Sequence, residues 1–134
     1  MNKTKANFRG LRELLGLTQT DLAEVAEVTK TAVKNWERPG TTEPPEDVWR
    51  WLLAAREQQR RVVDEGVSAV VAFGGNPQIT IYRSQGQYDE LGRDDGPVGA
   101  ANANALAVAD RLESMGYAVR FSYPDDADNI YHNA

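Results

Sequence analysis

The side chains best suited to bind a ligand lie in the stretch Thr29 to Arg38. At helical spacing, Ala32, Val33 and Trp36 fall on one side of it, and polar side chains fall on the other. A narrow helix with hydrogen-bond donors on its outward face fits the major groove of DNA. In that groove, lysine pairs with guanine and the threonine methyl suits thymine. The residues of this stretch predicted to contact DNA are Thr29, Lys30, Thr31, Lys34, Asn35 and Arg38.

Within this set, Lys30, Thr31 and Lys34 are assigned to base reading. The last two residues, Asn35 and Arg38, are assigned to phosphates or to the edge of the binding site. The competing interpretation is a polar face that is only solvated, as on most surface helices. These residues alone favour that second interpretation, so the case for base reading depends on the sequence around them.

Two earlier helices must hold this stretch in place. The first is predicted over Ala6 to Leu15, ends at Gly16, and buries Phe8, Leu11, Leu14 and Leu15. The second begins at Gln19 and carries Leu22, Ala23, Val25 and Ala26 on its apolar face. Thr29 then caps the third helix, because its hydroxyl can accept from a free amide of the next turn. The basic segment Met1 to Lys5 is expected to be frayed.

The segment GLTQTDLAEVAEVTKTAVKNWE, residues 16–37, resembles the helix-turn-helix of the lambda-repressor-like (xenobiotic-response-element type) regulators. Its GLTQ opening, Leu-Ala pair, Val-Thr step and closing Trp-Glu fall at the family's spacing, and the resemblance covers roughly Asn7 to Ala55. It implies that Arg12 and Glu37 pair and join the first helix to the third. It also implies that Gln19 contacts a phosphate at the start of the second helix.

One position departs from the family pattern. Glu27 stands where glycine is usual, because the backbone of this turn often needs a positive φ. A glutamate can adopt that conformation at a cost of about 1 kcal/mol. We therefore expect the helix-turn-helix to be retained, whereas the sequence leaves the geometry of the turn open.

The charge of the chain is distributed unevenly. The formal net charge is −5, which is unusual for a DNA-binding protein. Residues 1–65 hold 11 Lys+Arg and 11 Asp+Glu, whereas residues 66–134 hold 4 against 9. A locally basic face can therefore bind DNA while an acidic module lies elsewhere. The chain has no cysteine and no apolar run of about 18 residues, so we expect a cytoplasmic protein without a membrane span.

A long helix is predicted from about Pro45 to about Ala72, since proline suits a first helical turn. A competing interpretation ends this helix near Glu65 and makes residues 67–73 a strand. The long helix carries a seam that could pack against a partner copy or within the chain: Val48, Leu52, Ala55, Gln59, Val62, Gly66, Ala69 and Phe73. The three tryptophans, Trp36, Trp49 and Trp51, are expected to anchor the core.

The second half of the chain begins after the turn at Gly74 and predicts a strand, a helix and a strand. The first strand is expected over Gln78 to Arg83, followed by a polar loop over Ser84 to Gly96. Pro97 opens an alanine-rich helix that Gly116 ends, and alternation predicts a strand over Tyr117 to Tyr123. The two strands should be parallel. The chain from Pro124 onward is expected to be a loose acidic tail.

The fold class is therefore α+β. Residues 1–73 are predicted to form an all-helical helix-turn-helix bundle with a long connecting helix, and residues 74–134 a small strand-helix-strand dimerisation module. Two strands and one helix bury too little surface to be stable alone, which favours a homodimer. The residues predicted at the dimer interface are Ile79, Ile81, Val119, Phe121 and Tyr123.

The sequence gives no indication of an active site. The only histidine is His132, so neither a Ser-His-Asp arrangement nor a histidine-based metal site can be built. The acidic clusters at Asp94-Asp95 and Asp125 to Asp128 lack the glycine spacing of a calcium loop. Gly74-Gly75 is not followed by the Lys-Ser/Thr of a phosphate loop. We expect no catalytic residue, no metal, no cofactor and no enzyme activity.

A narrower resemblance bears on function. Trp36-Glu37 followed by PPEDVW, residues 44–49, is similar to small phage and bacterial autorepressors such as anti-CRISPR-associated regulators. It implies a homodimeric repressor of its own promoter that binds double-stranded DNA at an inverted repeat, and in some members its own transcript. An antitoxin-type regulator that binds a protein partner remains an alternative. The arginines that could contact the chain's own mRNA are Arg56, Arg60 and Arg61.

Overall fold

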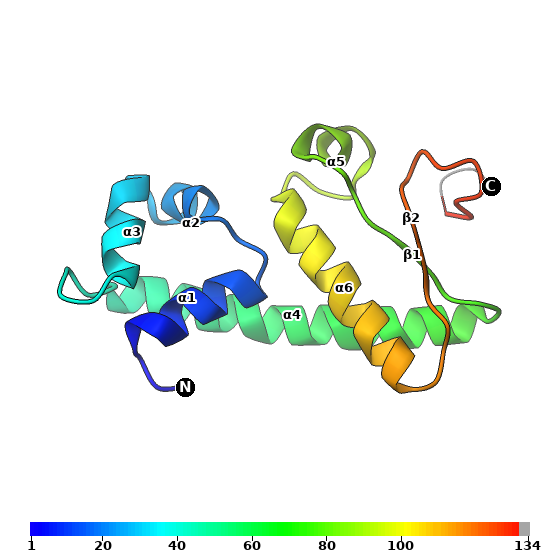
Figure 1. Ribbon diagram of the computed structural model, residues 1–134, viewed down its shortest axis with the longest axis horizontal. Helices are drawn as coiled ribbons and strands as arrows, with labels where there is room; N and C mark the ends of the chain where they lie inside the picture. The colour runs from blue at the N-terminus through cyan, green and yellow to red at the C-terminus, as the bar shows by residue number, and fades with distance from the viewer. Residues whose placement is uncertain (132–134) are drawn as a thin grey trace. The chain divides into compact units, whose positions relative to one another are not determined.

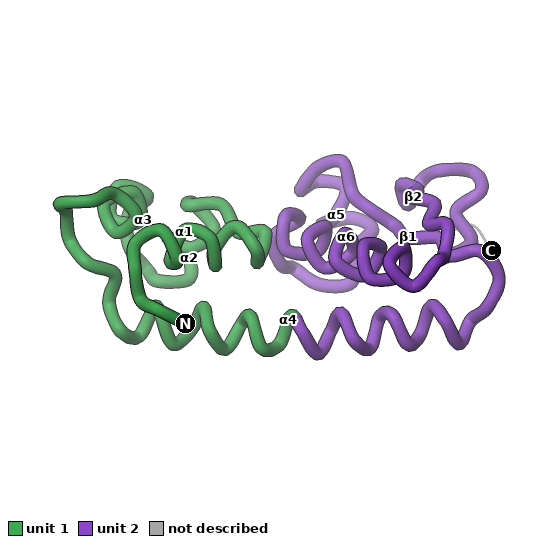
Figure 2. The backbone as a smooth tube through the Cα atoms, turned by 60° about the horizontal axis from the view of Figure 1, so that its bottom comes forward, with its two compact units in different colours: residues 1–59 green, residues 60–134 purple. Residues whose placement is uncertain are grey.

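The structure, a computed structural model, describes residues 1–131 of the chain. It divides into two compact units, residues 1–59 and residues 60–134 (Figure 2). Six helices and two strands are formed in the described part (Figure 1). The observed architecture is α+β, as predicted: a helical helix-turn-helix bundle, a long helix, and a small module of strands and helices.

The first unit is a bundle of helices: α1 (Lys5–Leu14), α2 (Gln19–Ala26), α3 (Lys30–Glu37) and the first half of α4 (Glu46–Phe73). Phe8 is fully buried at its centre, edge-on to Trp36 at 6.2 Å and to Trp49 at 5.3 Å between ring centroids. Edge-to-face aromatic contacts of this kind stabilise a core beyond the area that they bury. These rings therefore fix α1, α3 and α4 around one another.

Three expectations for the first unit are wrong in detail. Leu14 is exposed, because it lies to one side of the stripe formed by the buried residues Phe8, Leu11 and Leu15. Trp51 is exposed, unlike the other two tryptophans, since it points away from the face of α4 that carries Trp49 and Leu52. The N-terminal segment is not frayed: Thr4 caps α1, and Lys3 pairs with Glu46.

Helix α4 runs unbroken from Glu46 to Phe73, so the longer of the two predicted helices is correct and residues 67–73 form no strand. Its buried face differs from the predicted seam in the second half. Val63 and Val67 are buried there, whereas Phe73 is 68% exposed. A Cβ at Gly66 would lie 3.0 Å from Val108 Cγ2, so this glycine permits close packing of α6 on α4.

The second unit is built on that half of α4. Strands β1 (Gln78–Thr80) and β2 (Arg120–Ser122) pair in parallel, and Ile79 lies opposite Phe121. Between them come α5 (Gln85–Leu91) and α6 (Val98–Ser114). The core of this unit comprises Val63, Val67, Ile79, Val108, Ala109 and Leu112. The second half of α4 therefore belongs to this unit, and the division falls within the helix, before the Gly74 turn.

The segment expected as a polar loop contains helix α5. Ser84 caps it by accepting from the Gln87 amide at 3.1 Å, and Tyr88 is buried edge-on to Tyr82. Strand β1 is shorter than expected, because the Asn102 side chain bonds both the N–H and the C=O of Tyr82, each at 2.9 Å. An amide side chain thus takes the place of a neighbouring strand.

The acidic tail is folded back as far as Tyr131, contrary to expectation. Asn129 is buried, and its Nδ2 donates to Thr80 Oγ1 at 3.1 Å and to Ser122 Oγ at 3.2 Å. Both strands are therefore tied to this segment. His132 and the two residues after it lie outside the described residues.

Candidate nucleic-acid interface

Helix α3 is the element that carries the predicted contacts. Thr29 lies in extended backbone at its start, and its Oγ1 accepts from the Ala32 amide at 3.2 Å. Val33 and Trp36 are buried, so one side of the eight-residue helix faces the core. The opposite side is consequently turned outward along its whole length.

The predicted contact residues gather on that outward side. Lys30, Thr31, Lys34 and Arg38 are exposed, and Asn35 is half-buried. A guanidinium nitrogen of Arg38 donates to Asn35 Oδ1 at 3.2 Å, which joins the two residues assigned to phosphates. The arrangement offers two ammonium groups and one guanidinium to a ligand, in the geometry of a groove-binding helix.

A buried ion pair holds α3 against α1. Arg12 Nε lies 2.7 Å from Glu37 Oε2, and its Nη2 lies 2.9 Å from Oε1, with side chains 8% and 5% exposed. Arg12 Nη1 also donates to the Leu17 carbonyl oxygen at 2.8 Å. The arginine fork thus bonds the end of α3 and the linker before α2 at once, in the two-pronged geometry that gives such pairs specificity.

Gln19 lies at the start of α2, where the phosphate contact was predicted. Its Nε2 donates to Glu37 Oε1 at 3.3 Å, so the side-chain amide extends the Arg12–Glu37 pair. Helix geometry leaves the backbone amides of Gln19 and Thr20 without an intrahelical acceptor. The backbone amides of Gln19 and Thr20, rather than the Gln19 side chain, are therefore the groups at the start of α2 best placed for an anion.

The turn between α2 and α3 has a left-handed residue at Glu27, the position where the family pattern usually has glycine. Glu27 adopts φ 56° and ψ 45°, the only positive φ at a residue other than glycine in residues 1–131. Val28 donates to the Ala23 carbonyl at 3.0 Å, which closes the end of α2. The helix-turn-helix is therefore formed with a strained glutamate in place of glycine.

Lys5 is a residue of the interface region that sequence reasoning missed. Its side chain is 12% exposed, and Nζ donates to the carbonyl oxygens of Asn35 at 3.1 Å, Trp36 at 3.0 Å and Thr42 at 2.6 Å. A cation at the carboxyl end of a helix also interacts favourably with the helix dipole. Lys5 therefore fixes the end of α3, and no motif in the sequence identifies such a contact.

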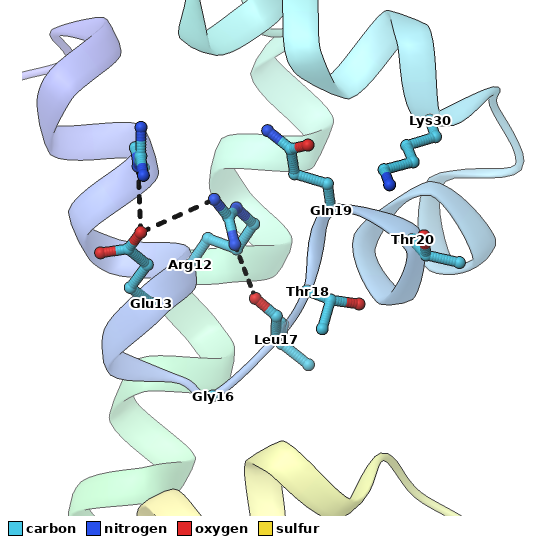
Figure 3. A pocket seen from close by; sticks show the side chains of 9 residues that line it. Arg12, Glu13, Gly16, Leu17, Thr18, Gln19, Thr20 and Lys30 are labelled. Atoms are coloured by element: carbon cyan, nitrogen blue, oxygen red, sulfur yellow. Dashed lines mark hydrogen bonds and ion pairs between the residues drawn. The ribbon is translucent and has the colours of Figure 1, made fainter.

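A depression of about 470 Å³ opens beside the amino ends of α2 and α3 (Figure 3). It is lined by Arg9, Arg12, Glu13, Gly16, Leu17, Thr18, Gln19, Thr20 and Lys30. Arg9 Nε donates to Glu13 Oε1 at 3.0 Å, and this bond holds the pKa of the Glu13 carboxyl below its usual range. Lys30 from α3 and the first turn of α2 thus face one polar hollow.

Thr18 lines this hollow, and its role as the cap of α2 could have been predicted from the sequence. Its hydroxyl accepts from the Asp21 amide at 3.0 Å, and Asp21 Oδ2 accepts from the Thr18 amide at 2.8 Å. A threonine followed three residues later by an acidic side chain is the signal of such a capping box. The cap fixes the first turn of α2, whose free amides face the hollow.

The residues predicted at a dimer interface separate into two groups. Ile79 is in the core of the second unit and Val119 packs against it, so neither belongs to an open surface. Phe121 and Tyr123 are 40% and 37% exposed. With Ile81, they line a shallow hollow of about 190 Å³.

Comparison with known families agrees with this geometry. Residues 8–50 match the model of a helix-turn-helix family, so the first unit carries a lambda-repressor-like helix-turn-helix domain. The comparison with curated proteins gave no match. The domain supports a role for this chain as a DNA-binding helix-turn-helix transcription regulator. Within residues 1–131, no helix is long and apolar enough to cross a membrane, and no cluster of His, Cys, Asp or Glu is arranged to hold a metal ion.

Proposed function

We propose that this protein is a sequence-specific transcriptional repressor that binds an inverted-repeat operator as a homodimer. The observation that supports this most directly is the outward face of α3, where Lys30, Thr31 and Lys34 are exposed. They stand on a helix whose other face is fixed by Val33 and Trp36. Rigid placement matters, because base readout requires donors held in register with base edges.

The proposed division of labour follows the position of each side chain. Lys30, Thr31 and Lys34 read bases in the major groove, while Asn35 and Arg38 contact the phosphate backbone at the edge of the site. The free amides at the start of α2 bind a further phosphate. Thr29 acts through its cap, since its hydroxyl already accepts from the Ala32 amide.

A two-fold operator follows from the proposed homodimer. Two copies of α3 related by a dimer axis would enter successive major grooves, with half-sites about 34 Å or a multiple apart. The second unit, residues 60–134, holds 6 Lys+Arg and 11 Asp+Glu, so its negative charge makes it unsuited to contact with DNA. Repression would then be steric, by occupation of a promoter.

The proposed target is the protein's own promoter. This part rests on the similarity of residues 36–49 to small autorepressors of phages and mobile elements. Footprinting of the DNA upstream of the gene tests it, and protection of an inverted repeat there is the expected result. The corresponding leader RNA, added as competitor, measures whether the message is also bound.

The substitution Lys34→Ala tests base reading. It should weaken operator binding by about 1–3 kcal/mol and relax the preference at one base pair of each half-site. Arg111→Ala is the matched control, because it removes one exposed cation from the second unit and should leave the base preference unchanged. A uniform loss of affinity across all operator variants would show that Lys34 contacts only phosphate.

A further inference from the structure

Strand β2 leaves one edge of the two-stranded sheet open. The Arg120 amide donates to the Pro77 carbonyl at 3.0 Å, and the Ser122 carbonyl accepts from the Ile81 amide at 3.0 Å. Successive residues of a strand direct their backbone groups to opposite sides. The N–H and C=O of Phe121 therefore point away from β1, and neither has a hydrogen-bond partner among residues 1–131.

The neighbouring backbone on this edge is already occupied. The Tyr123 amide donates to Asp126 Oδ2 at 2.8 Å, and its carbonyl accepts from Asn129 Nδ2 at 2.9 Å. Within β2 and the residue that follows it, hydrogen bonds to a further strand can therefore form at Phe121 but not at Tyr123. Among the three residues of β2, Phe121 is the one whose backbone groups are directed to this edge, so the register proposed below is centred there.

The same position carries exposed apolar surface. The Phe121 ring is 40% exposed and lies with Ile81 and Tyr123 around the shallow hollow of about 190 Å³. Charged side chains and proline are what usually protect an open edge. Strand β2 has no proline, and its one charged residue, Arg120, is paired with Asp128 of its own chain. A parallel pair of three-residue strands is also short for an independent sheet.

We propose that a second copy of this chain pairs with β2 in an antiparallel arrangement, with Phe121 opposite its own counterpart. The two residues exchange both N–H···O=C bonds, and a four-stranded sheet in the order β1-β2-β2-β1 results. The inference rests on the proposed function, because it gives the geometry of the dimer that an inverted-repeat operator requires.

Charge and symmetry favour a second copy over an unrelated strand. In this register, Arg120 lies opposite Ser122 of the other copy, so no like charges face each other. Arg120 is also paired with Asp128 of its own chain. A two-fold axis between the two Phe121 residues suits this edge, because each copy then supplies one donor and one acceptor there.

Disulfide trapping tests the register, because the native chain has no cysteine. Residues in a hydrogen-bonded antiparallel pair have Cα atoms about 5.5 Å apart, within the range that a disulfide spans. Phe121→Cys should therefore give a covalent dimer under mild oxidation. Leu106→Cys and Met115→Cys are the controls, since both positions are exposed on or next to α6. They should cross-link several-fold less at the same protein concentration.

The native mass of the unmodified protein is measured alongside. A dimer whose Phe121→Cys variant cross-links no better than the controls refutes the β2 pairing but leaves the proposed repressor intact. A monomeric protein at the concentration that saturates operator DNA refutes both. Retention of operator binding by the oxidised Phe121→Cys dimer supports the pairing, and loss of that binding on oxidation contradicts it.

Discussion

Removal of Arg12 should destabilise the first unit far more than removal of a surface arginine. In Arg12→Met, the Glu37 carboxylate would lose both bonds of the arginine fork, at 2.7 and 2.9 Å. It would keep only the Gln19 amide at 3.3 Å, inside a site where its side chain is 5% exposed. The variant therefore leaves a buried charge without a counter-ion.

The expected loss follows from that burial. Breaking a buried ion pair by removing one partner costs about 3–5 kcal/mol, because the remaining charge stays desolvated. Replacing both partners with apolar residues is often neutral. Arg12→Met combined with Glu37→Leu should therefore recover most of the loss. The coupling between the two sites in a double-mutant cycle should be about 2–4 kcal/mol.

Tryptophan fluorescence is the appropriate assay. All three tryptophans are in the first unit, at positions 36, 49 and 51, so their emission reports its unfolding in urea without contribution from the second unit. Circular dichroism at 222 nm would follow both units together. Separate midpoints in the two signals would give the free energy of unfolding for the first unit alone.

The control is Arg9→Met. Arg9 and Glu13 form an exposed pair at 3.0 Å, whose loss should leave the free energy of unfolding almost unchanged because solvent screens it. If Arg12→Met were as mild as Arg9→Met, the buried pair would contribute nothing. If Arg12→Met combined with Glu37→Leu lowered the free energy of unfolding by the sum of the two single effects, the reasoning about the uncompensated Glu37 charge would be refuted.

Three further outcomes are expected. Glu27→Gly should raise the free energy of unfolding by up to about 1 kcal/mol, because relief of the left-handed strain exceeds the added chain entropy, and urea denaturation measures it. Lys5→Met should destabilise the first unit by about 1–3 kcal/mol yet leave the salt dependence of operator binding unchanged, since Lys5 bonds α3 rather than phosphate. The Asp94 carboxyl has a pKa below its usual range, because the Tyr88 hydroxyl and the Gly96 amide donate hydrogen bonds to it. The ionised carboxyl therefore stabilises the folded state above about pH 4. This stabilisation is lost as the pH falls through the lowered pKa. Asp94→Asn should flatten that part of the pH profile of unfolding, and an unchanged profile would contradict the assignment.

The helix-turn-helix could be predicted because its constraints are local. Thr29 as a cap, Val33 and Trp36 as the buried face, and the pairing of Arg12 with Glu37 each follow from spacing or from the family resemblance. Their contacts lie within about one motif length, so a single sequence contains both partners. The position of Lys5 did not follow, because its acceptors are backbone carbonyls of α3, and any sequence provides those.

The second unit was predicted in outline only. Its parallel strand pair and α6 follow from alternation and from the proline and glycine that bound the helix. Helix α5 did not follow, since QGQYDEL has two glutamines and a glycine and depends on the burial of Tyr88. The fold of the tail depends on Asn129 reaching Thr80 and Ser122, which is a contact between distant residues.

The seam on α4 shows why one helix can carry two different faces. A strict alternation of four and three residues from Val48 assumes a period of 3.5, but a straight α-helix turns once in 3.6 residues. Over the 28 residues of α4 the seam would drift around the helix unless a supercoiled partner followed it. Instead, Val48 and Leu52 face the first unit's core, while Val63 and Val67 face α6. The helix is therefore buried by two successive intrachain cores, and self-association through the exposed edge of β2 needs no coiled coil along α4.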